Sequence, residues 1–307
     1  MHIAVLGGSG FIGHHVTRWL VEAGSDVTVI HRGRTSLRAG GARSLTADRH
    51  QPAALTKALA VAAPRVLIDM TAYGRVDVNR LLAALPASVE HLVLISSGDV
   101  YWTYGAFLGQ GPVVATAGPQ DETAPLREQL HPYRARASGP DDLMYQYEKI
   151  EVERAARANA AVPVTILRLP MVYGPGDPQQ RVGRYQERLR ANPTELRVNT
   201  GEAGWRCTRG YVEDVAWAIR LAALDDRAAG QTFNVGEANA LTELDWIRAI
   251  AGALGWQGSV LADPTEPPSL PVDWRIPLVA DTDRIRRTLD FREPVGREEG
   301  LRRTTTA

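Results

Sequence analysis

The sequence of 307 residues contains very little cysteine and very little lysine. Its single cysteine, Cys207, excludes a disulfide framework and any zinc site built from several cysteines. Lys57 and Lys149 are the only lysines among 35 basic residues, so nearly all of the positive charge is carried by arginine. Because 35 acidic residues balance these 35, the net charge is zero. A dedicated nucleic-acid or anionic-membrane binder normally carries an excess of positive charge, so we expect neither partner.

The sequence also lacks long apolar stretches and recognisable metal motifs. No apolar run approaches the roughly 18 residues that a membrane span requires. The first residues lack the charged segment and the long apolar segment of a secretory signal, so we expect a cytoplasmic protein. The adjacent His14 and His15 would face different directions on a helix, and the other histidines show no ligand spacing. We therefore expect no metal.

Short apolar runs alternate with amphipathic segments through the first half of the chain. The expected strands are Ile3–Leu6, Val27–Ile30, Val66–Asp69, His91–Ser96 and Val164–Arg168, and the expected helices are Phe11–Ala23, Pro52–Ala62, Val78–Leu85 and Asp141–Ala160. Because these strands are almost entirely apolar, they predict a parallel sheet with helices on both faces. Thr103–Pro140 lacks periodicity and is expected to form a lid or binding loop. The irregular, tryptophan-rich region after Arg168 is expected to form a smaller lobe at the carboxyl edge of the sheet.

A glycine-rich turn follows the first expected strand and opens the first expected helix. Gly7, Gly10 and Gly13 match the spacing of dinucleotide-binding turns. Glycine permits the tight turn and lets the backbone approach a pyrophosphate, whose charge the helix N-terminus stabilises. A glycine-rich turn without a ligand is the alternative, and the position between a strand and a helix disfavours it. The segment therefore predicts a dinucleotide cofactor.

The end of the second expected strand bears on the choice between NAD and NADP. His31-Arg32-Gly33-Arg34 contains no acid that could bind the ribose 2′-hydroxyl of NAD. Arg32, with Arg34 nearby, can instead form charge-assisted hydrogen bonds to the 2′-phosphate of NADP. The alternative is that both are solvated loop arginines. We take NADP selectivity as the hypothesis, with NAD as the less favoured cofactor.

Tyr145 and Lys149 form a Tyr-x-x-x-Lys motif on the expected helix Asp141–Ala160. Side chains four residues apart on a helix lie on one face, so the ammonium would lie near the phenol and favour its ionised form. The motif alone is weak, because helices commonly contain both residue types. Ser96 and Ser97 strengthen it, since they end an expected strand at the carboxyl edge of the sheet. A serine there can hydrogen-bond the reacting oxygen of a substrate while the tyrosine moves its proton.

Together these motifs resemble the extended short-chain dehydrogenase/reductases, the NAD(P)-dependent epimerase/dehydratase superfamily. The resemblance covers nearly the whole chain and rests on Gly7–Gly13, Asp48, Ser96–Tyr101, Tyr145 with Lys149, Arg168–Asp177, Tyr211–Ala216 and Phe233–Gly236. It implies an α/β fold, with a Rossmann-type doubly wound parallel sheet and a smaller C-terminal α/β substrate lobe. Residues 1–170, with 212–235 returning to them, would bind NADP, and residues 171–211 and 236–307 would form the lobe.

The resemblance also implies roles for individual residues. Tyr145 would be the catalytic acid/base, Lys149 would hold the nicotinamide ribose and activate the tyrosine, and Ser97 would supply the catalytic hydroxyl. The residues expected at the cofactor are Gly7, Gly10, Phe11, Ile12, Gly13, Arg32, Asp48, Thr71, Ala72, Tyr145, Lys149 and Pro170. Members commonly form homodimers through two helices, here Val78–Leu85 and Asp141–Ala160.

Three departures from the family pattern narrow the expected chemistry. Gly98 and Asp99 stand where dehydratases carry an Asp-Glu pair, so dehydration is disfavoured. Met171 stands where many sugar-nucleotide members carry an asparagine, and Cys207 stands where an arginine often binds the substrate diphosphate. The changes at Met171 and Cys207 argue against a UDP- or dTDP-sugar substrate. They do not exclude it, because Arg206 and Arg209 flank Cys207.

The sequence thus predicts an NADP(H)-dependent oxidoreductase or epimerase that transfers hydride at a secondary alcohol or ketone of a sugar, sugar nucleotide or related small molecule. The alternative is an NADP-sensing regulatory or RNA-binding protein derived from the same superfamily, without hydride chemistry. Ser97, Tyr145 and Lys149 argue against that alternative, and so does the zero net charge.

Overall fold

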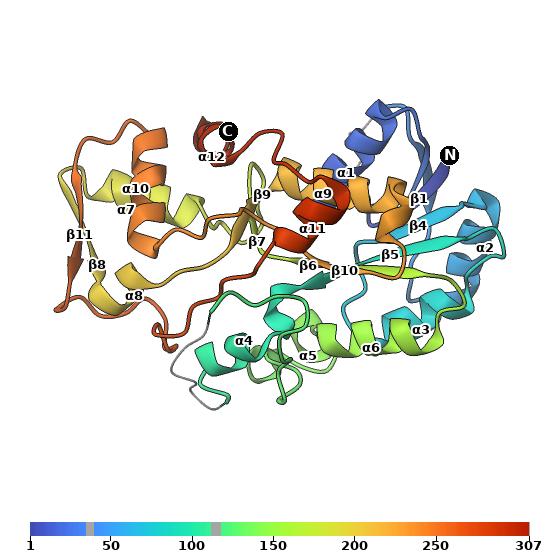
Figure 1. Cartoon of the computed structure of the whole chain (residues 1–307), viewed down its shortest axis with the longest axis horizontal. Coiled ribbons are helices and arrows are strands. Elements are labelled where there is room, and N and C mark those ends of the chain that lie inside the picture. The colour runs from blue at the N-terminus through green and yellow to red at the C-terminus, as the bar shows by residue number, and fades with distance from the viewer. Residues whose placement is uncertain (35–39, 112–117, 307) are drawn as a thin grey trace.

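A parallel sheet of seven strands forms the larger part of the computed structural model, which describes residues 1–34, 40–111 and 118–306 (Figure 1). The strand order is β10-β6-β5-β4-β1-β2-β3, and every neighbouring pair is parallel. The strands are β1 (His2–Leu6), β2 (Asp26–His31), β3 (Arg43–Thr46), β4 (Val66–Asp69), β5 (His91–Ser97), β6 (Val164–Leu169) and β10 (Thr232–Asn234). The predicted Rossmann-type doubly wound sheet is confirmed.

The strands are apolar because both faces of the sheet are covered. Alternate residues of β1 enter different cores: Ile3 and Val5 pack on one face, and Ala4 and Leu6 on the other. The first face is covered by α1 (Phe11–Glu22) and α9 (Val212–Leu224), and the second by α2 (Pro52–Ala62), α3 (Arg75–Ala83) and α6 (Lys149–Asn159) (Figure 1). Because β1, β4 and β5 are parallel neighbours, the loops that follow them lie together at the carboxyl edge of the sheet.

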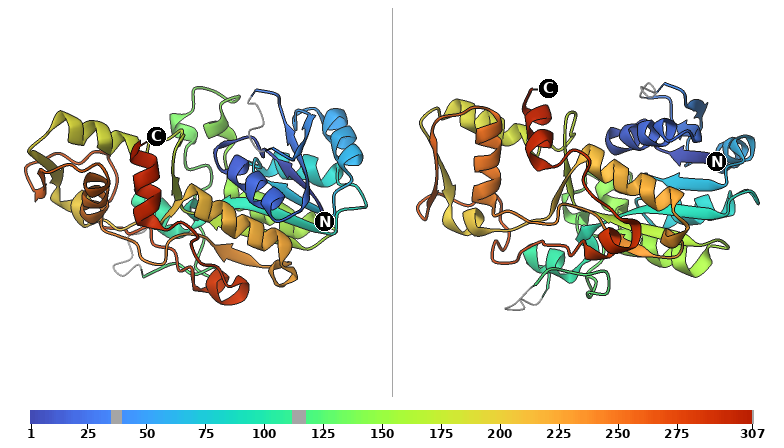
Figure 2. Two further views of the ribbon diagram at one scale, coloured as in Figure 1. Left: turned by 90° about the horizontal axis from the view of Figure 1, so that it is seen from above. Right: turned by 45° about the horizontal axis from the view of Figure 1, so that its top comes forward.

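A second, smaller group of elements lies beyond that edge, at the left of Figure 1 and again in Figure 2. It contains the parallel pair β8–β11 and the helices α7, α8 and α10, and the short parallel pair β7–β9 lies between it and the main sheet. These elements are β7 (Met171–Tyr173), α7 (Gly183–Ala191), β8 (Glu195–Asn199), α8 (Thr200–Gly204), β9 (Arg209–Tyr211), α10 (Glu243–Ala253) and β11 (Ser259–Asp263). The last helix of the chain, α12 (Arg297–Thr306), packs against α10.

The chain returns from this group to the main sheet before it ends. Helix α9 packs against α1, strand β10 pairs with β6, and α11 (Asp283–Leu289) lies against β10. The returning part therefore includes the predicted segment 212–235 and also a helix from the predicted lobe. The exact division of the chain into two units stays a prediction.

One predicted helix is wrong, and its failure changes the candidate site. Asp141–Ala160 is divided into α5 (Leu143–Gln146) and α6, which begins at Lys149. The segment Thr103–Pro140, expected to be a loop, contains most of helix α4 (Trp102–Phe107) and the short 3₁₀ helix η2 (Arg134–Arg136). The other two short 3₁₀ helices among the described residues are η1 (Gly98–Val100), directly after β5, and η3 (Asp226–Ala228).

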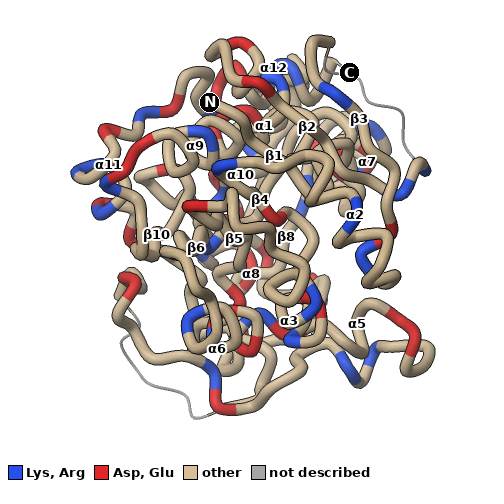
Figure 3. The backbone as a smooth tube through the Cα atoms, turned by 90° about the vertical axis from the view of Figure 1, so that its right-hand side faces the viewer, with Lys and Arg blue, Asp and Glu red and all other residues tan. Residues whose placement is uncertain are grey.

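The charges of the chain are mixed along its length. Figure 3 shows Lys and Arg interspersed with Asp and Glu over the elements that face the viewer. Across residues 1–34, 40–111 and 118–306, no helix is long and apolar enough to cross a membrane.

Candidate active site

The glycine turn between β1 and α1 is packed tightly at two of its three motif positions. Gly7 has a φ of +87°, and a Cβ there would lie 2.4 Å from the Thr71 Cγ2 atom. A Cβ on Gly13 would lie 2.3 Å from the Gly7 carbonyl oxygen. A side chain at Gly13 would meet backbone atoms, and one at Gly7 would meet the Thr71 side chain from a left-handed backbone conformation, so both glycines are explained by the fold itself.

Gly10 requires a different explanation. Its nearest contact for an added Cβ is the Gly7 oxygen at 3.4 Å, so the fold alone would tolerate a side chain. Gly10 is exposed at the N-cap of α1, whose first turn has no side-chain cap and no acidic residue, and Phe11 and Ile12 begin that helix. The free space and the helix N-terminus fit a pyrophosphate, as the dinucleotide motif predicts.

An ion pair that the sequence analysis missed holds the adjoining loop after β4. The Arg49 guanidinium donates to both carboxylate oxygens of Asp69, at 2.8 and 3.0 Å, and also to the Thr71 hydroxyl. Arg49 and Asp69 are both buried, and burial opposes the charge of Arg49, while Asp69 raises its pKa overall. Thr71 and the buried Ala72, predicted to contact the cofactor, are therefore fixed beside Gly7.

The other predicted cofactor residues lie at several places around this edge. Arg32 is exposed directly after β2. Burial raises the pKa of the nearby Tyr73, and the charge of Arg32 opposes part of that rise. Asp48 accepts a hydrogen bond from the His50 amide at 2.9 Å. Pro170 follows β6 and lies close to Gly210 and Gly236. Direct contacts of Arg32, Asp48 and Pro170 with a cofactor stay predictions.

The hydroxyl groups of Ser97 and Tyr147 meet at the end of β5. The Tyr147 hydroxyl donates to the Asp99 carboxylate at 2.8 Å, and the Asp99 amide donates to the Ser97 Oγ atom at 3.3 Å. Burial and the Asp99 charge hold the pKa of Tyr147 well above its usual value, although a hydrogen bond with Ser97 acts in the opposite direction. The tyrosine beside the predicted catalytic serine is thus Tyr147, which the sequence analysis did not select.

Lys149 completes the cluster from the first residue of α6. Its Nζ atom donates to the carbonyl oxygens of Ala72 at 2.6 Å and Ile95 at 2.9 Å. The same atom lies 5.7 Å from the Tyr147 ring centroid and 5.1 Å from that of Tyr73. Burial lowers the pKa of Lys149 to about 8. The ammonium therefore joins the loop after β4 to strand β5 next to the two tyrosine rings.

A buried carboxylate explains why α6 begins where it does. The Glu148 side chain accepts from the Ile150 amide at 2.9 Å, from the His131 amide at 2.5 Å and from the Arg127 guanidinium at 3.1 Å. Glu148 has an extended backbone, with φ −159° and ψ 97°, and is completely buried. Its three contacts pull the chain out of the helical path, so Tyr147 turns toward Asp99.

Tyr145 lies on the other side of this break, in α5. Its ring stacks under the Arg134 guanidinium at 4.5 Å, and its carbonyl oxygen accepts a hydrogen bond from Arg134. Tyr145 and Lys149 do not share a helix, so the predicted shared helical face is wrong. The catalytic and cofactor roles that the family resemblance implies for Tyr145 stay predictions, without the support of a shared helical face.

The residues around Cys207 form a closed, largely aromatic wall. Cys207 is buried with Phe107, Trp205 and Ile276, and burial raises the pKa of its thiol to about 12. Partly buried side chains packed on this group include Trp102, Tyr104, Met171, Trp274 and Leu278. The thiol is thus a packing group.

The two arginines that flank Cys207 are already engaged. Buried Arg209 forms an ion pair with buried Glu243, and Arg206 donates to the Ala240 carbonyl oxygen at 2.8 Å. The diphosphate-binding role considered for these arginines would require both to exchange their partners.

A family model agrees with the fold and the glycine turn. The model of the NAD dependent epimerase/dehydratase family matches residues 3–236. The chain belongs to this family. It is therefore an NAD(P)-dependent enzyme of the reductase and epimerase type, and the resemblance inferred from the motifs is confirmed.

Individual relatives from this family are distant in sequence. A 2'-dehydrokanamycin reductase of Streptomyces kanamyceticus is 26% identical over 296 residues, which cover 94% of this chain and 74% of the relative. A 2-alkyl-3-oxoalkanoate reductase of Stenotrophomonas maltophilia (strain K279a) is also 26% identical, over 272 residues that cover 83% of this chain and 76% of the relative. The UDP-glucose 4-epimerase of Thermus thermophilus, solved with NAD, has a TM-score of 0.70 at 25% identity, covering 100% of this chain and 98% of its own.

Proposed function

We propose that the protein is an NADP(H)-dependent reductase or epimerase that transfers hydride at a ketone or secondary alcohol of a sugar or sugar-like small molecule. The observation that carries this proposal is the cluster of Ser97, Tyr147 and Lys149 beside the glycine turn and the loop that contains Ala72. The cluster supplies a hydrogen-bond donor, a proton donor and a cation at the edge where this family binds its cofactor. Two relatives are named as reductases, which favours reduction over epimerisation.

Each residue of the cluster has a distinct task in this mechanism. The bound nicotinamide supplies the hydride. Ser97 donates a hydrogen bond to the substrate oxygen, and Tyr147 donates its hydroxyl proton to the same oxygen as negative charge develops there. Lys149 uses two of its three protons on the Ala72 and Ile95 carbonyl groups, which leaves one for a ribose hydroxyl. In the direction of alcohol oxidation, the Tyr147 phenolate takes the proton back.

The substrate proposal depends on the charges of the smaller lobe. Cys207 is buried, Arg209 is paired with Glu243, and Arg206 is bound to the Ala240 carbonyl oxygen, so the two arginines that flank Cys207 are engaged within the protein. We therefore expect a substrate without a diphosphate. An NADPH-oxidation screen over sugar-like ketones, small ketones and UDP-sugars tests the function and the substrate class together. Turnover confined to UDP-sugars would contradict the substrate class, whereas no turnover, with salt-dependent binding of structured RNA, would favour the non-enzymatic alternative.

Arg32 carries the proposed preference for NADP. We expect Arg32→Ala to weaken NADPH binding by roughly ten- to a hundred-fold, because it loses charge-assisted hydrogen bonds to the 2′-phosphate. NADH binding should change little. Titration of both cofactors into both proteins, followed by nicotinamide fluorescence, measures the ratio. An equal loss for the two cofactors, or equal affinities in the unsubstituted protein, would remove the argument for NADP.

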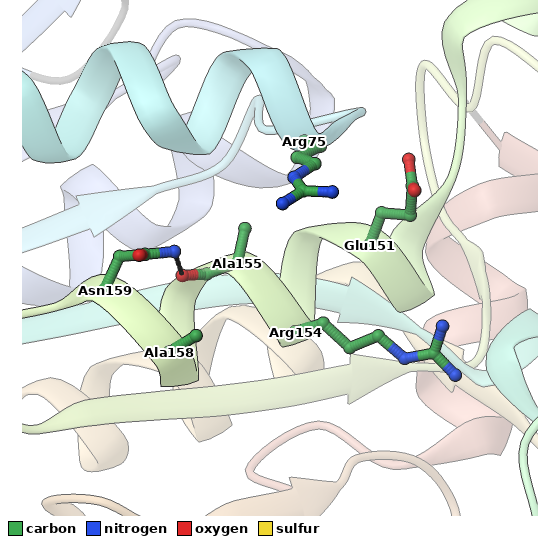
Figure 4. Close-up of a pocket in the computed structure, with 6 residues that line it drawn as sticks. All are labelled: Arg75, Glu151, Arg154, Ala155, Ala158 and Asn159. Atoms are coloured by element: carbon green, nitrogen blue, oxygen red, sulfur yellow. Dashed lines mark hydrogen bonds between the residues drawn. The ribbon is translucent and has the colours of Figure 1, made fainter.

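A homodimer is the proposed assembly, through the outer faces of α3 and α6. These two helices lie side by side, and Arg75, Glu151 and Arg154 line a shallow hollow on them (Figure 4). Charges of both signs allow two copies related by a twofold axis to pair arginine with glutamate. We expect light scattering to give twice the monomer mass for the unsubstituted protein. We expect a lower mass for Arg154→Glu. A monomer mass for the unsubstituted protein at micromolar concentration would refute the dimer.

A further inference from the structure

Asp99 is a buried carboxylate that receives two phenol hydroxyls at one oxygen. Tyr147 donates to its Oδ2 atom at 2.8 Å, and Tyr133 donates to the same atom at 2.9 Å. The Tyr133 and Tyr104 hydroxyls are hydrogen-bonded at 2.8 Å. The Asp99 Oδ1 atom is buried and has no hydrogen-bond partner among the described residues. Asp99 is 6% exposed, so it is a group whose charge water screens only weakly.

The positive charges that face Asp99 come from two directions. The Arg127 Nε atom donates to the Asp99 carbonyl oxygen at 2.5 Å, and its guanidinium acts against the rise in the pKa of the Asp99 carboxyl that burial causes. Lys149 contributes in the same sense. Arg136 faces Tyr104 at the far end of the hydroxyl chain. Burial raises the pKa of Asp99 overall, and the two cations and two phenol donors limit that rise by stabilising the carboxylate.

The hydroxyl of Tyr147 lies closer to the Asp99 carboxylate than to the ammonium of Lys149. The hydroxyl is hydrogen-bonded to Asp99, whereas the Lys149 Nζ atom is 5.7 Å from the centre of the Tyr147 ring and donates to two backbone carbonyls. A phenolate at this place would lie within hydrogen-bond distance of a second anion. The arrangement therefore disfavours loss of the Tyr147 proton until a substrate oxygen accepts it.

We propose that Asp99 is a positioning residue that holds the Tyr147 hydroxyl in its protonated, proton-donating form. This inference rests on the proposed role of Tyr147 as the proton donor. It makes the protein ready for carbonyl reduction over the whole neutral range, since the required form of Tyr147 is the resting one. Alcohol oxidation requires the phenolate and therefore becomes faster only at alkaline pH.

The ionisation of Tyr147 can be measured directly and without a substrate. The absorbance of tyrosinate is titrated in the unsubstituted protein and in Tyr147→Phe, and the difference between the two curves isolates Tyr147. The same pair of titrations is repeated in an Asp99→Asn background, which keeps the shape of the side chain and removes its charge. We expect the ionisation of Tyr147 to move down by roughly 1–3 pH units in that background.

Kinetic profiles and a matched variant complete the test. In Asp99→Asn, the alkaline loss of kcat/KM for ketone reduction and the alkaline gain for alcohol oxidation should both move to lower pH, whereas a merely structural role would lower turnover at every pH. Tyr133→Phe removes one hydrogen-bond donor to Asp99 and keeps the charge of the Asp99 carboxylate. It should therefore move neither the alkaline loss of reduction nor the alkaline gain of oxidation to lower pH. Equal titrations of Tyr147 in the two backgrounds would overturn the proposal, and so would an ionisation below about 10 with Asp99 intact. A change in kcat/KM near pH 8 that is the same in the unsubstituted protein and in Asp99→Asn would belong to Lys149. That result would also overturn the proposal. Unchanged turnover by Tyr147→Phe would instead refute the proposed role of Tyr147 as proton donor, whatever the titrations give.

Discussion

Tyr147→Phe is expected to lower the turnover of a ketone substrate by about 10²- to 10⁴-fold, the usual contribution of a positioned proton donor. The substitution removes one oxygen atom, and the ring can keep its edge-on contact with Tyr133, whose centroid lies 5.1 Å away. Cofactor affinity and thermal stability should therefore remain close to their original values. Single-turnover oxidation of bound NADPH measures the chemical step directly.

Tyr145→Phe is the matched control, because it makes the same chemical change two residues earlier in the chain. The ring of Tyr145 in α5 stacks with the guanidinium of Arg134 in η2, so turnover should be unchanged. If Tyr145→Phe is inactive and Tyr147→Phe is active, the Tyr-x-x-x-Lys interpretation is right, and α5 and α6 must join into one helix when the cofactor binds.

The main sheet could be predicted because its determinants are local and repeated. Buried parallel strands leave continuous apolar runs in the sequence, and five such runs became β1, β2, β4, β5 and β6. Strand β3 was missed because it is an edge strand. Three of its four residues are exposed, and Leu45 is its only apolar residue, so it gives no such signal.

The candidate site was predicted less well because its determinants are distant in the chain. Tyr147 approaches Asp99 at the point where Glu148 leaves the helical path, and Glu148 is held there by partners distant in the chain, among them Arg127, 21 residues away. Helical periodicity describes neighbours three or four residues apart and contains no information about such a contact.

The same contact supplies the second large expected effect, which concerns stability. Glu148→Ala should lower the free energy of unfolding by about 3–5 kcal/mol, because it leaves the buried Arg127 guanidinium without its carboxylate and removes the cap of α6. Denaturant unfolding measures the loss. The exposed pair of Arg65 and Glu90 is the matched control, and Glu90→Ala should leave stability nearly unchanged.

A double variant separates the stability of this ion pair from its effect on the site. Arg127→Met with Glu148→Met replaces both charges by apolar side chains of similar length and should recover most of the lost stability. Turnover should stay low, because the variant also removes the Arg127 hydrogen bond to the Asp99 carbonyl oxygen and the Glu148 bond to the His131 amide. Recovery of both stability and turnover would show that the ion pair only fills space. Recovery of stability alone would show that this buried pair is kept for the position it gives to Tyr147 and Asp99.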